Sequence, residues 1–266
     1  MIRKGNRGED VRRLQVLLGV DPADGIFGSQ TEAAVIAFQK KHGLTPDGIV
    51  GSLTWAALEK ESKAEPKADV LIILGTAHGI NTAGKRSPDG RLREYKWSRE
   101  VCDMVEAALK EKGYNVTVDL KQDYEPNLGF RVNIVNNLCK KAKNALYVSI
   151  HINAGGMGDK WTNASYWTVW TSRGQTKGDK LATRIWNEAH ALLPQCETVK
   201  ADWADGDPDY ESNFYVLAHT SCPACLTENL MQDNRADCDW LLTDEAKALF
   251  TEIHVRGIEN YIKYDL

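Results

Sequence analysis

The pattern of hydrophobic and polar positions changes near residue 70. Before it, apolar residues recur every three or four positions, the spacing typical of amphipathic helices. Two sets each share a helical face: Val11, Leu14, Leu17 and Leu18, and Ala34, Val35 and Phe38. Helices are predicted in "GEDVRRLQVLLG", "SQTEAAVIAFQKKHG" and "SLTWAALEK". Residues 1–60 are therefore expected to form a small all-α domain of three helices.

After residue 70, apolar runs typical of buried strands alternate with amphipathic stretches. Strands are predicted in "VLIILGTAHG", "YNVTVDL", "NALYVSIHINA", "SYWTVWTS" and "CLTENL", and helices in "EYKWSREVCDMVEAALKEKG", "RVNIVNNLCKKA", "KGDKLATRIWNEAHALL" and residues 244–264. This alternation predicts an α/β domain over residues 70–266, with a mostly parallel or mixed twisted sheet flanked by helices. The charged stretch "ESKAEPKAD", residues 61–69, is expected to be a linker.

The first domain contains an internal repeat. The stretch "DGIFGSQTEAAV" at 24–35 recurs as "DGIVGSLTWAAL" at 47–58. In each copy Asp-Gly is expected to form a turn. Ile26 or Ile49 would then fill a core position, and Ser29 or Ser52 would cap the following helix.

These stretches, together with "GEDVRRLQ", resemble the peptidoglycan-binding domain found at the ends of many cell-wall hydrolases. The resemblance covers nearly all of residues 1–60 and implies a groove for glycan or stem peptide. A purely structural helical appendage is the alternative.

Composition excludes several classes of function. With 42% hydrophobic and 26% charged residues and a net charge of -4, the chain has the composition of a soluble globular protein and is not expected to bind nucleic acid. No stretch is long and apolar enough to insert into a membrane, and the start has no secretory signal pattern. The chain is expected to be cytoplasmic until release or another export route brings it to its target. Its origin could be a phage or a bacterium, and a monomer is expected.

The six cysteines are too sparse for a disulfide scaffold, so mostly reduced thiols are expected. The stretch "HTSCPAC" leaves two alternatives open. His219, Cys222 and Cys225 could join Cys238 in a structural zinc site, or two of these thiols could form a disulfide.

Two histidines stand where predicted strands end, His78 in "GTAHGI" and His151 in "SIHINA". The carboxyl edge of an α/β sheet is where such proteins keep their sites, and catalytic zinc takes three nitrogen or oxygen ligands and leaves one position for water. Glu94 opens the next helix and is a candidate third ligand. Glu228 ends the strand in "PACLTE" and could act as a base. Hydrogen-bonded histidines without a metal are the alternative.

The spacing and flanks of these residues resemble the zinc-dependent N-acetylmuramoyl-L-alanine amidases, over almost all of residues 70–265. Of the family's Asp-Pro-Gly-His-Gly loop this chain keeps His78 and Gly79. The resemblance implies zinc held by His78, Glu94 and His151, with Glu228 as general base and then acid. It further implies cleavage between the lactyl group of N-acetylmuramic acid and L-alanine, by a phage endolysin or an autolysin. Arg131 in "FRVNIVNN" is expected to be structural.

Several residues are further candidates for contact with peptidoglycan. Asn153 and His219 could bind substrate, the alternatives being loop support and a solvent-facing position. Trp161 or Trp203 could stack on glycan. The acidic stretch "DGDPDYE", residues 205–211, is interpreted as a solvated loop rather than a calcium site. A zinc peptidase acting on stem peptides and a non-catalytic wall-binding protein are the rival functions.

Overall fold

The computed structural model describes residues 1–20, 22–62, 70–193 and 198–266, and the chain divides into two compact units, Met1–Glu65 and Pro66–Leu266. Of the predicted linker, residues 61 and 62 end a helix, because the helical pattern continues through them, and 63–69 lie outside the described residues. No helix of the described chain is long and apolar enough to cross a membrane.

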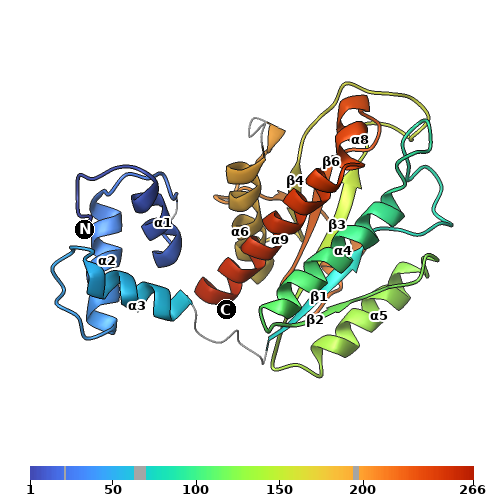
Figure 1. Cartoon of the computed structure of the whole chain (residues 1–266). Coiled ribbons are helices and arrows are strands. Elements are labelled where there is room, and N and C mark those ends of the chain that lie inside the picture. The colour runs from blue at the N-terminus through green and yellow to red at the C-terminus, as the bar shows by residue number, and fades with distance from the viewer. Residues whose placement is uncertain (21, 63–69, 194–197) are drawn as a thin grey trace. The chain divides into compact units, whose positions relative to one another are not determined.

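The first unit consists of three helices, as predicted: α1 (Glu9–Leu18), α2 (Ser29–Lys41) and α3 (Ser52–Ser62) (Figure 1). They pack around a small core of Val11, Leu14, Phe27, Val35, Phe38, Val50 and Leu58. This core is small for an independent fold, so the polar contacts of the unit matter for its stability.

The predicted roles of the repeated isoleucines and of one serine are wrong. Ile26 is 38% exposed and Ile49 is half-buried, while the next residue in each copy, Phe27 or Val50, fills the core. Successive side chains of an extended segment point to opposite sides, so a one-residue error exchanges inside for outside. Ser29 is the first helical residue, and Gly28 occupies the N-cap without a side-chain hydrogen bond.

Two buried glutamines hold the repeated turns. The Gln15 Nε2 donates to Asp24 Oδ1 at 2.8 Å, and its Oε1 accepts from the Gly25 backbone N–H at 2.7 Å. Gln39 makes the matching bonds to the second turn, residues 47–49, at 2.9 Å each. The internal repeat is therefore a repeat of one polar contact between a helix and the turn that follows it.

The second unit forms a six-stranded sheet in the order β2-β1-β3-β6-β4-β5. Its strands are β1 (Val70–Thr76), β2 (Asn115–Val118), β3 (Asn144–Asn153), β4 (Thr168–Thr171), β5 (Tyr210–Glu211) and β6 (Ala224–Met231). Strands β2, β1, β3 and β6 pair in parallel, whereas β4 is antiparallel to β6. This confirms the predicted α/β class with a mixed, mostly parallel sheet.

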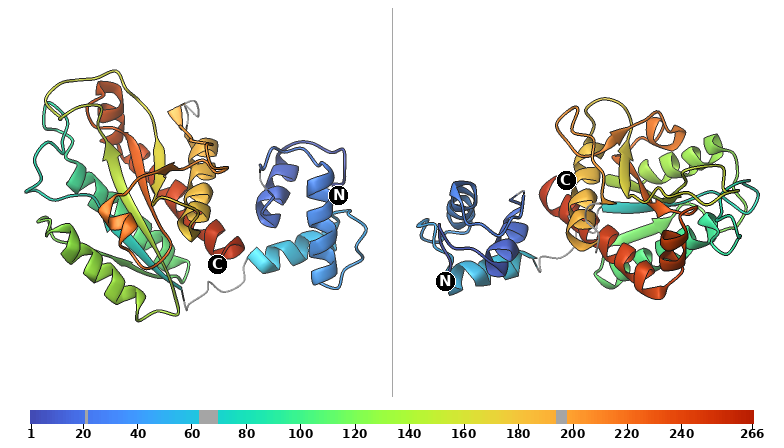
Figure 2. Two further views of the ribbon diagram at one scale, coloured as in Figure 1. Left: turned by 180° about the vertical axis from the view of Figure 1, so that it is seen from behind. Right: turned by 90° about the horizontal axis from the view of Figure 1, so that it is seen from above.

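Helices cover both faces of this sheet. The helices are α4 (Glu94–Glu111), α5 (Leu128–Cys139), α6 (Lys177–Leu192), α7 (Tyr215–Ala218), α8 (Arg235–Leu241) and α9 (Asp244–Tyr264). Helices α4, α6 and α9 share the larger core with alternate residues of β1 such as Ile72 and Leu74. Helices α5 and α7 pack on the opposite face with Leu71 and Ile73, and the left view of Figure 2 shows the unit from that side.

The topology brings the carboxyl ends of β1, β3 and β6 to one edge. In the register of β3 and β6, His151 lies opposite Glu228. Strand β6 comes late in the sequence but lies between β3 and β4 in the sheet. Residues that follow or end these strands are therefore placed next to one another.

Candidate active site

Three of the predicted residues converge at this edge from separate elements. His78 follows β1, Glu94 is the first residue of α4, and His151 lies near the end of β3. The Glu94 Oε1 is 3.0 Å from His151 Nδ1 and 3.7 Å from His78 Nε2. Possible ligand atoms of all three residues lie within 4.8 Å of one another, a separation that one metal ion can bridge.

The protonation states of Glu94 and His151 suit metal binding. Burial opposes ionisation of Glu94, but the hydrogen bond to His151 and the nearby histidines outweigh it and lower the pKa of Glu94. Burial lowers the pKa of His151 to about 4, although Glu94 opposes the shift. An ionised carboxylate beside a neutral imidazole is the combination in which both groups donate electron pairs to a metal.

One oxygen of this group is left for a ligand. Glu94 is fully buried, its Oε1 accepts the Ile152 N–H at 3.2 Å, and its Oε2 has no hydrogen-bond partner. Buried carboxylate oxygens are normally paired, so the position requires a partner that the protein itself does not supply. Two histidines and one glutamate are also a donor set of catalytic zinc, so the residues present fit this metal.

Glu228 lies beside the group, on the adjoining strand. Its Oε2 is buried without a hydrogen-bond partner. Burial, reinforced by the charge of Glu94, raises the pKa of Glu228 well above its usual range. A bound divalent cation would reverse this tendency by favouring the ionised carboxylate.

Two residues that the sequence reasoning missed hold the outer sides of the histidine rings. Glu125 Oε2 lies 3.4 Å from His78 Nδ1, and Ser149 Oγ lies 3.1 Å from His151 Nε2. Although burial opposes it, the bonds from His78 and Thr82 lower the pKa of Glu125 to about 2. Glu125 follows β2, whose carboxyl end meets the same edge of the sheet. Its position after a predicted strand is the feature of the sequence that could have pointed to it.

The loop after β1 has a constrained backbone around His78. His78 has a φ of 42°, in the left-handed region. A Cβ added to Gly79 would lie 2.3 Å from the Glu125 backbone nitrogen, so only glycine fits at that position. Gly79 is therefore the residue that allows this loop to approach Glu125.

Arg131 lies beneath the site and is almost fully buried. It donates to the Thr76 carbonyl, and its Nη1 lies 3.2 Å from Asp119 Oδ2. Its Nη2 lies 3.5 Å from Glu125 Oε1. These contacts tie the ends of β1 and β2 together and match the structural role expected for this arginine.

A pocket of about 210 Å³ opens beside the three residues. Its polar lining includes His78, His151, Glu228 and Lys85, which the sequence reasoning also missed. Its apolar lining consists of Leu128, Phe214, Tyr215, Val216 and Leu226. The pocket thus combines an apolar wall with the charged groups that could act on a bound amide.

The other substrate-binding candidates lie apart from this pocket. The Asn153 Oδ1 accepts the neighbouring Ala154 N–H at 2.8 Å, which is a loop-supporting contact. His219 is exposed, stacks on Tyr215 with ring centroids 4.1 Å apart, and does not line the pocket. Trp203 is 60% exposed, whereas the ring of Trp161 lies under the Arg235 guanidinium.

The alternative zinc site in "HTSCPAC" is not formed. Cys225 and Cys238 lie in the larger core, whereas Cys222 packs with the cluster on the opposite face of the sheet. Within the described parts of the chain, His78, Glu94 and His151 are the only group of three or more such side chains with ligand atoms close enough for a metal.

The interpretation of residues 205–211 as a solvated loop is wrong for Asp209. Asp209 is 1% exposed, and it accepts a hydrogen bond from Thr171 Oγ1 at 2.5 Å. Burial and the neighbouring Asp207 raise the pKa of Asp209 to about 8. The reason is that this segment leads into β5, which pairs with β4 and draws Asp209 against the sheet.

Comparison with protein families gives two matches. A model described as N-acetylmuramoyl-L-alanine amidase matches residues 72–260, and one for a peptidoglycan binding domain matches residues 7–58. Together they cover both compact units.

Similar solved structures agree with the fold. An N-acetylmuramoyl-L-alanine amidase from Clostridium difficile 630 is 21% identical with a TM-score of 0.64, over 75% of this chain and 100% of that one. The catalytic domain of the amidase CwlV from Bacillus (Paenibacillus) polymyxa var. colistinus is 22% identical with a TM-score of 0.57, over 72% and 97%.

Curated relatives match over different lengths. The Bacillus subtilis (strain 168) protein YqiI is 26% identical over 201 residues, covering 74% of this chain and 87% of that protein. A Kitasatospora aureofaciens protein is 45% identical over 69 residues, covering 23% of this chain, and the match spans 58% of its length.

Proposed function

The chain belongs to the N-acetylmuramoyl-L-alanine amidase family and acts on cell-wall peptidoglycan; from this premise we propose that zinc and a glutamate base carry out the cleavage. His78, Glu94 and His151 would hold the zinc ion, and Glu228 would be the base. The observation that carries the proposal is the pair of buried, unpartnered carboxylate oxygens, Glu94 Oε2 and Glu228 Oε2, at one sheet edge.

Each residue has a distinct task in the proposed reaction. When bound, zinc supplies Lewis-acid chemistry, polarising the scissile carbonyl and acidifying a water molecule. Glu228 Oε2 takes the proton from this water and then delivers it to the departing amine of L-alanine. Glu125 and Ser149 keep the histidine rings oriented through their outer nitrogens.

Lys85 and Arg131 are the cations among the described residues that line the pocket, and the charge of Lys85 acts on both Glu94 and Glu228. Arg131 is almost fully buried, so Lys85 is the more accessible of the two. We propose that it attracts the acidic groups of the stem peptide. The apolar wall formed by Leu128, Phe214 and Tyr215 would contact the aliphatic part of the same substrate. Asn153 would support the loop after β3, and His219 would act through Tyr215, on which it stacks.

The first unit would serve as the wall anchor. Binding to peptidoglycan would raise the effective concentration of the amidase unit at its substrate. The chain would need no second copy for this arrangement, because all the residues proposed for the reaction lie in one amidase unit.

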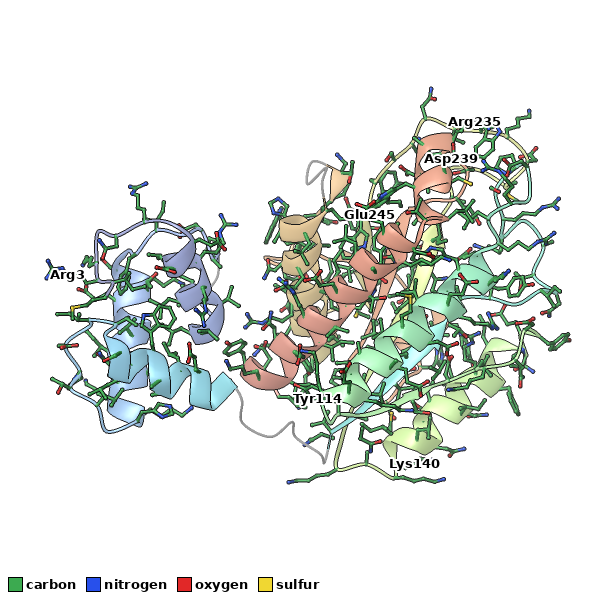
Figure 3. The ribbon with its side chains drawn as sticks, viewed as in Figure 1. Arg3, Tyr114, Lys140, Arg235, Asp239 and Glu245 are labelled. Atoms are coloured by element: carbon green, nitrogen blue, oxygen red, sulfur yellow. The ribbon has the colours of Figure 1, made fainter. Side chains whose placement is uncertain are left out.

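The test is mass spectrometry of the fragments released from purified peptidoglycan. Wild type is expected to release stem peptides that begin with L-alanine, and Glu228→Gln, which keeps the side-chain size, is expected to release about 100-fold to 10,000-fold less. Glu245→Gln is the matched control, because Glu245 is exposed on the first turn of α9 (Figure 3). Shortened stems still bound to muramic acid would indicate a zinc peptidase. Wall binding without any released fragment would indicate a non-catalytic protein.

A further inference from the structure

Two half-buried cysteines meet at the sheet edge opposite the candidate active site. Cys139 is the last residue of α5, and Cys222 comes shortly before β6. Their thiols are joined by a hydrogen bond. Glu228 lies six residues beyond Cys222, roughly 20 Å along an extended strand. The pair is therefore separate from the proposed zinc chemistry.

The surrounding contacts hold the two cysteines in place. The Asn136 side chain, on α5, donates to the His219 carbonyl at 2.9 Å and accepts the Ser221 N–H at 2.8 Å. The segment before β6 is thus fixed to the helix that carries Cys139. Both cysteines also pack against the same apolar cluster, and their thiols already lie within hydrogen-bond distance of each other.

The pair opens onto a surface pocket of about 280 Å³ that has a basic lining. Lys140, Lys143 and Lys177 line it, and none of its described lining residues is an Asp or Glu. Lys140 marks this end of α5 in Figure 3. Such a lining attracts anionic ligands and favours a thiolate.

The same contacts distinguish the two thiols. The hydrogen bond from Cys222, supported by one from Ser221, lowers the pKa of Cys139 to about 7, although burial opposes the shift. The bond to Cys139, together with burial, raises the pKa of Cys222. Because two side-chain donors, Cys222 and Ser221, reach the Cys139 sulfur, Cys139 is the thiol whose thiolate is stabilised by its contacts, and we assign it as the attacking sulfur with Cys222 as the resolving one. Cys102, Cys225 and Cys238, by contrast, are buried.

We propose that Cys139 and Cys222 form a thiol–disulfide exchange site that reacts with anionic low-molecular-weight disulfides such as oxidised glutathione. The Cys139 thiolate attacks one sulfur of the small disulfide, whose S–S bond breaks and releases one thiolate. Cys222 then loses its proton to solvent and attacks Cys139 Sγ, releasing the second thiolate. Two protein thiols are oxidised to one disulfide, and one small disulfide is reduced to two thiols.

The experiment uses the reduced full-length protein at low ionic strength. It is incubated with oxidised glutathione or with the cationic disulfide cystamine, alkylated, and mapped by mass spectrometry without reduction. A Cys139–Cys222 cross-linked peptide is expected, forming at least about tenfold faster with oxidised glutathione than with cystamine. Two free thiols, or a pairing with other cysteines, would overturn the proposal, and equal rates would overturn its preference for anions.

Variants test the order of the two steps. Cys222→Ser should stop at a mixed disulfide on Cys139, and Cys139→Ser should abolish reaction at both positions. Cys102→Ala, which changes a buried cysteine on α4, should still form the cross-link. A Cys222→Ser protein that shows no adduct on Cys139 would contradict the assignment of Cys139 as the attacking thiol.

Discussion

The two units treat buried polar groups in opposite ways. In the first, Gln15 and Gln39 are buried and each bonds to the turn that follows its helix. Among the described side chains of that unit, none leaves a buried nitrogen or oxygen unpaired. In the second, buried polar atoms without a hydrogen-bond partner occur on Glu94 and Glu228 at the candidate active site, and also on Arg131, Asp207, Asp209 and Gln232. A paired buried group helps to fix a fold, whereas an unpaired one costs stability. Only where two such groups converge at one sheet edge, on Glu94 and Glu228, is a ligand position proposed.

Metal removal is the strongest test of this contrast. Treatment with a chelator should reduce stem-peptide release at least roughly 1000-fold, because the Lewis acid is lost, and added Zn²⁺ should restore it. Binding of the protein to purified walls should be unchanged, since the first unit contains no predicted metal ligand. Full activity in a preparation shown by elemental analysis to lack metal would refute the zinc proposal.

His254 separates two explanations of this contrast. A buried group could stabilise the fold because it is paired, or because it lies in the first unit. His254 is buried in the second unit but paired, with Nε2 2.9 Å from Thr227 Oγ1 and Nδ1 2.6 Å from the Phe250 carbonyl oxygen. Burial lowers its pKa from 6.5 to about 4. The unfolded chain therefore binds the proton first as the pH falls.

The unfolding free energy should fall by about 3 kcal/mol between pH 6.5 and pH 4 on account of this residue. Urea unfolding of wild type and His254→Gln at several pH values measures the effect. The variant should be less sensitive to acid in this window. An identical pH dependence would mean that His254 does not titrate as its burial requires.

Gln39→Ala tests the paired side of the comparison. The change leaves the Gly48 N–H and Asp47 without their partner, and should lower the unfolding free energy of the first unit by about 2 kcal/mol. The control is Lys40→Ala, at an exposed position of the same helix. Chemical denaturation monitored by hydrogen exchange of the backbone amides in residues 1–62 reports on this unit, because tryptophan emission would be dominated by the seven tryptophans of the second unit. Equal stability of the two variants would mean that the bonds to the turn contribute little.

Glu125→Gln has the smallest expected effect. It tests a paired carboxylate of the second unit beside the unpaired oxygens of Glu94 and Glu228. Loss of the carboxylate beside His78 should weaken zinc affinity about tenfold, because the outer partner of a metal-binding histidine orients the ring. Competition with a chelating dye measures this affinity. Asp123→Asn, at a largely exposed acid nearby, should leave it unchanged. A Glu125→Gln protein with wild-type affinity would show that His78 is positioned by its backbone alone.

The sequence predicted the long elements and the residues that end them, because period and length are properties of the chain itself. It therefore placed the candidates His78, Glu94, His151 and Glu228 at or near the ends of elements, and the structure brings the first three together. Their roles came from the resemblance to the amidases and stay predictions. It failed where a tertiary contact decides the outcome. Ile26 was wrong by one position at a turn, which no periodic pattern resolves.

The contacts that join distant segments of the chain could not be predicted from the sequence either. Glu125 reaches His78 only because Gly79 permits a close approach, and Cys139 meets Cys222 only because α5 packs beside the start of β6. Asp209 is buried by a strand of two residues, too short to give a pattern. Pairings of this kind depend on sheet order rather than on local sequence.

The position of β6 in the sheet determines the order in which the parts of the candidate site become available during synthesis. The three proposed ligands have all been synthesised by residue 151, but the proposed base arrives only at residue 228. Its strand must then pair with β3 on one side and β4 on the other, both made earlier. A nascent chain can thus complete its metal-binding residues long before it can cut, and hydrolytic competence appears only when the centre of the sheet closes.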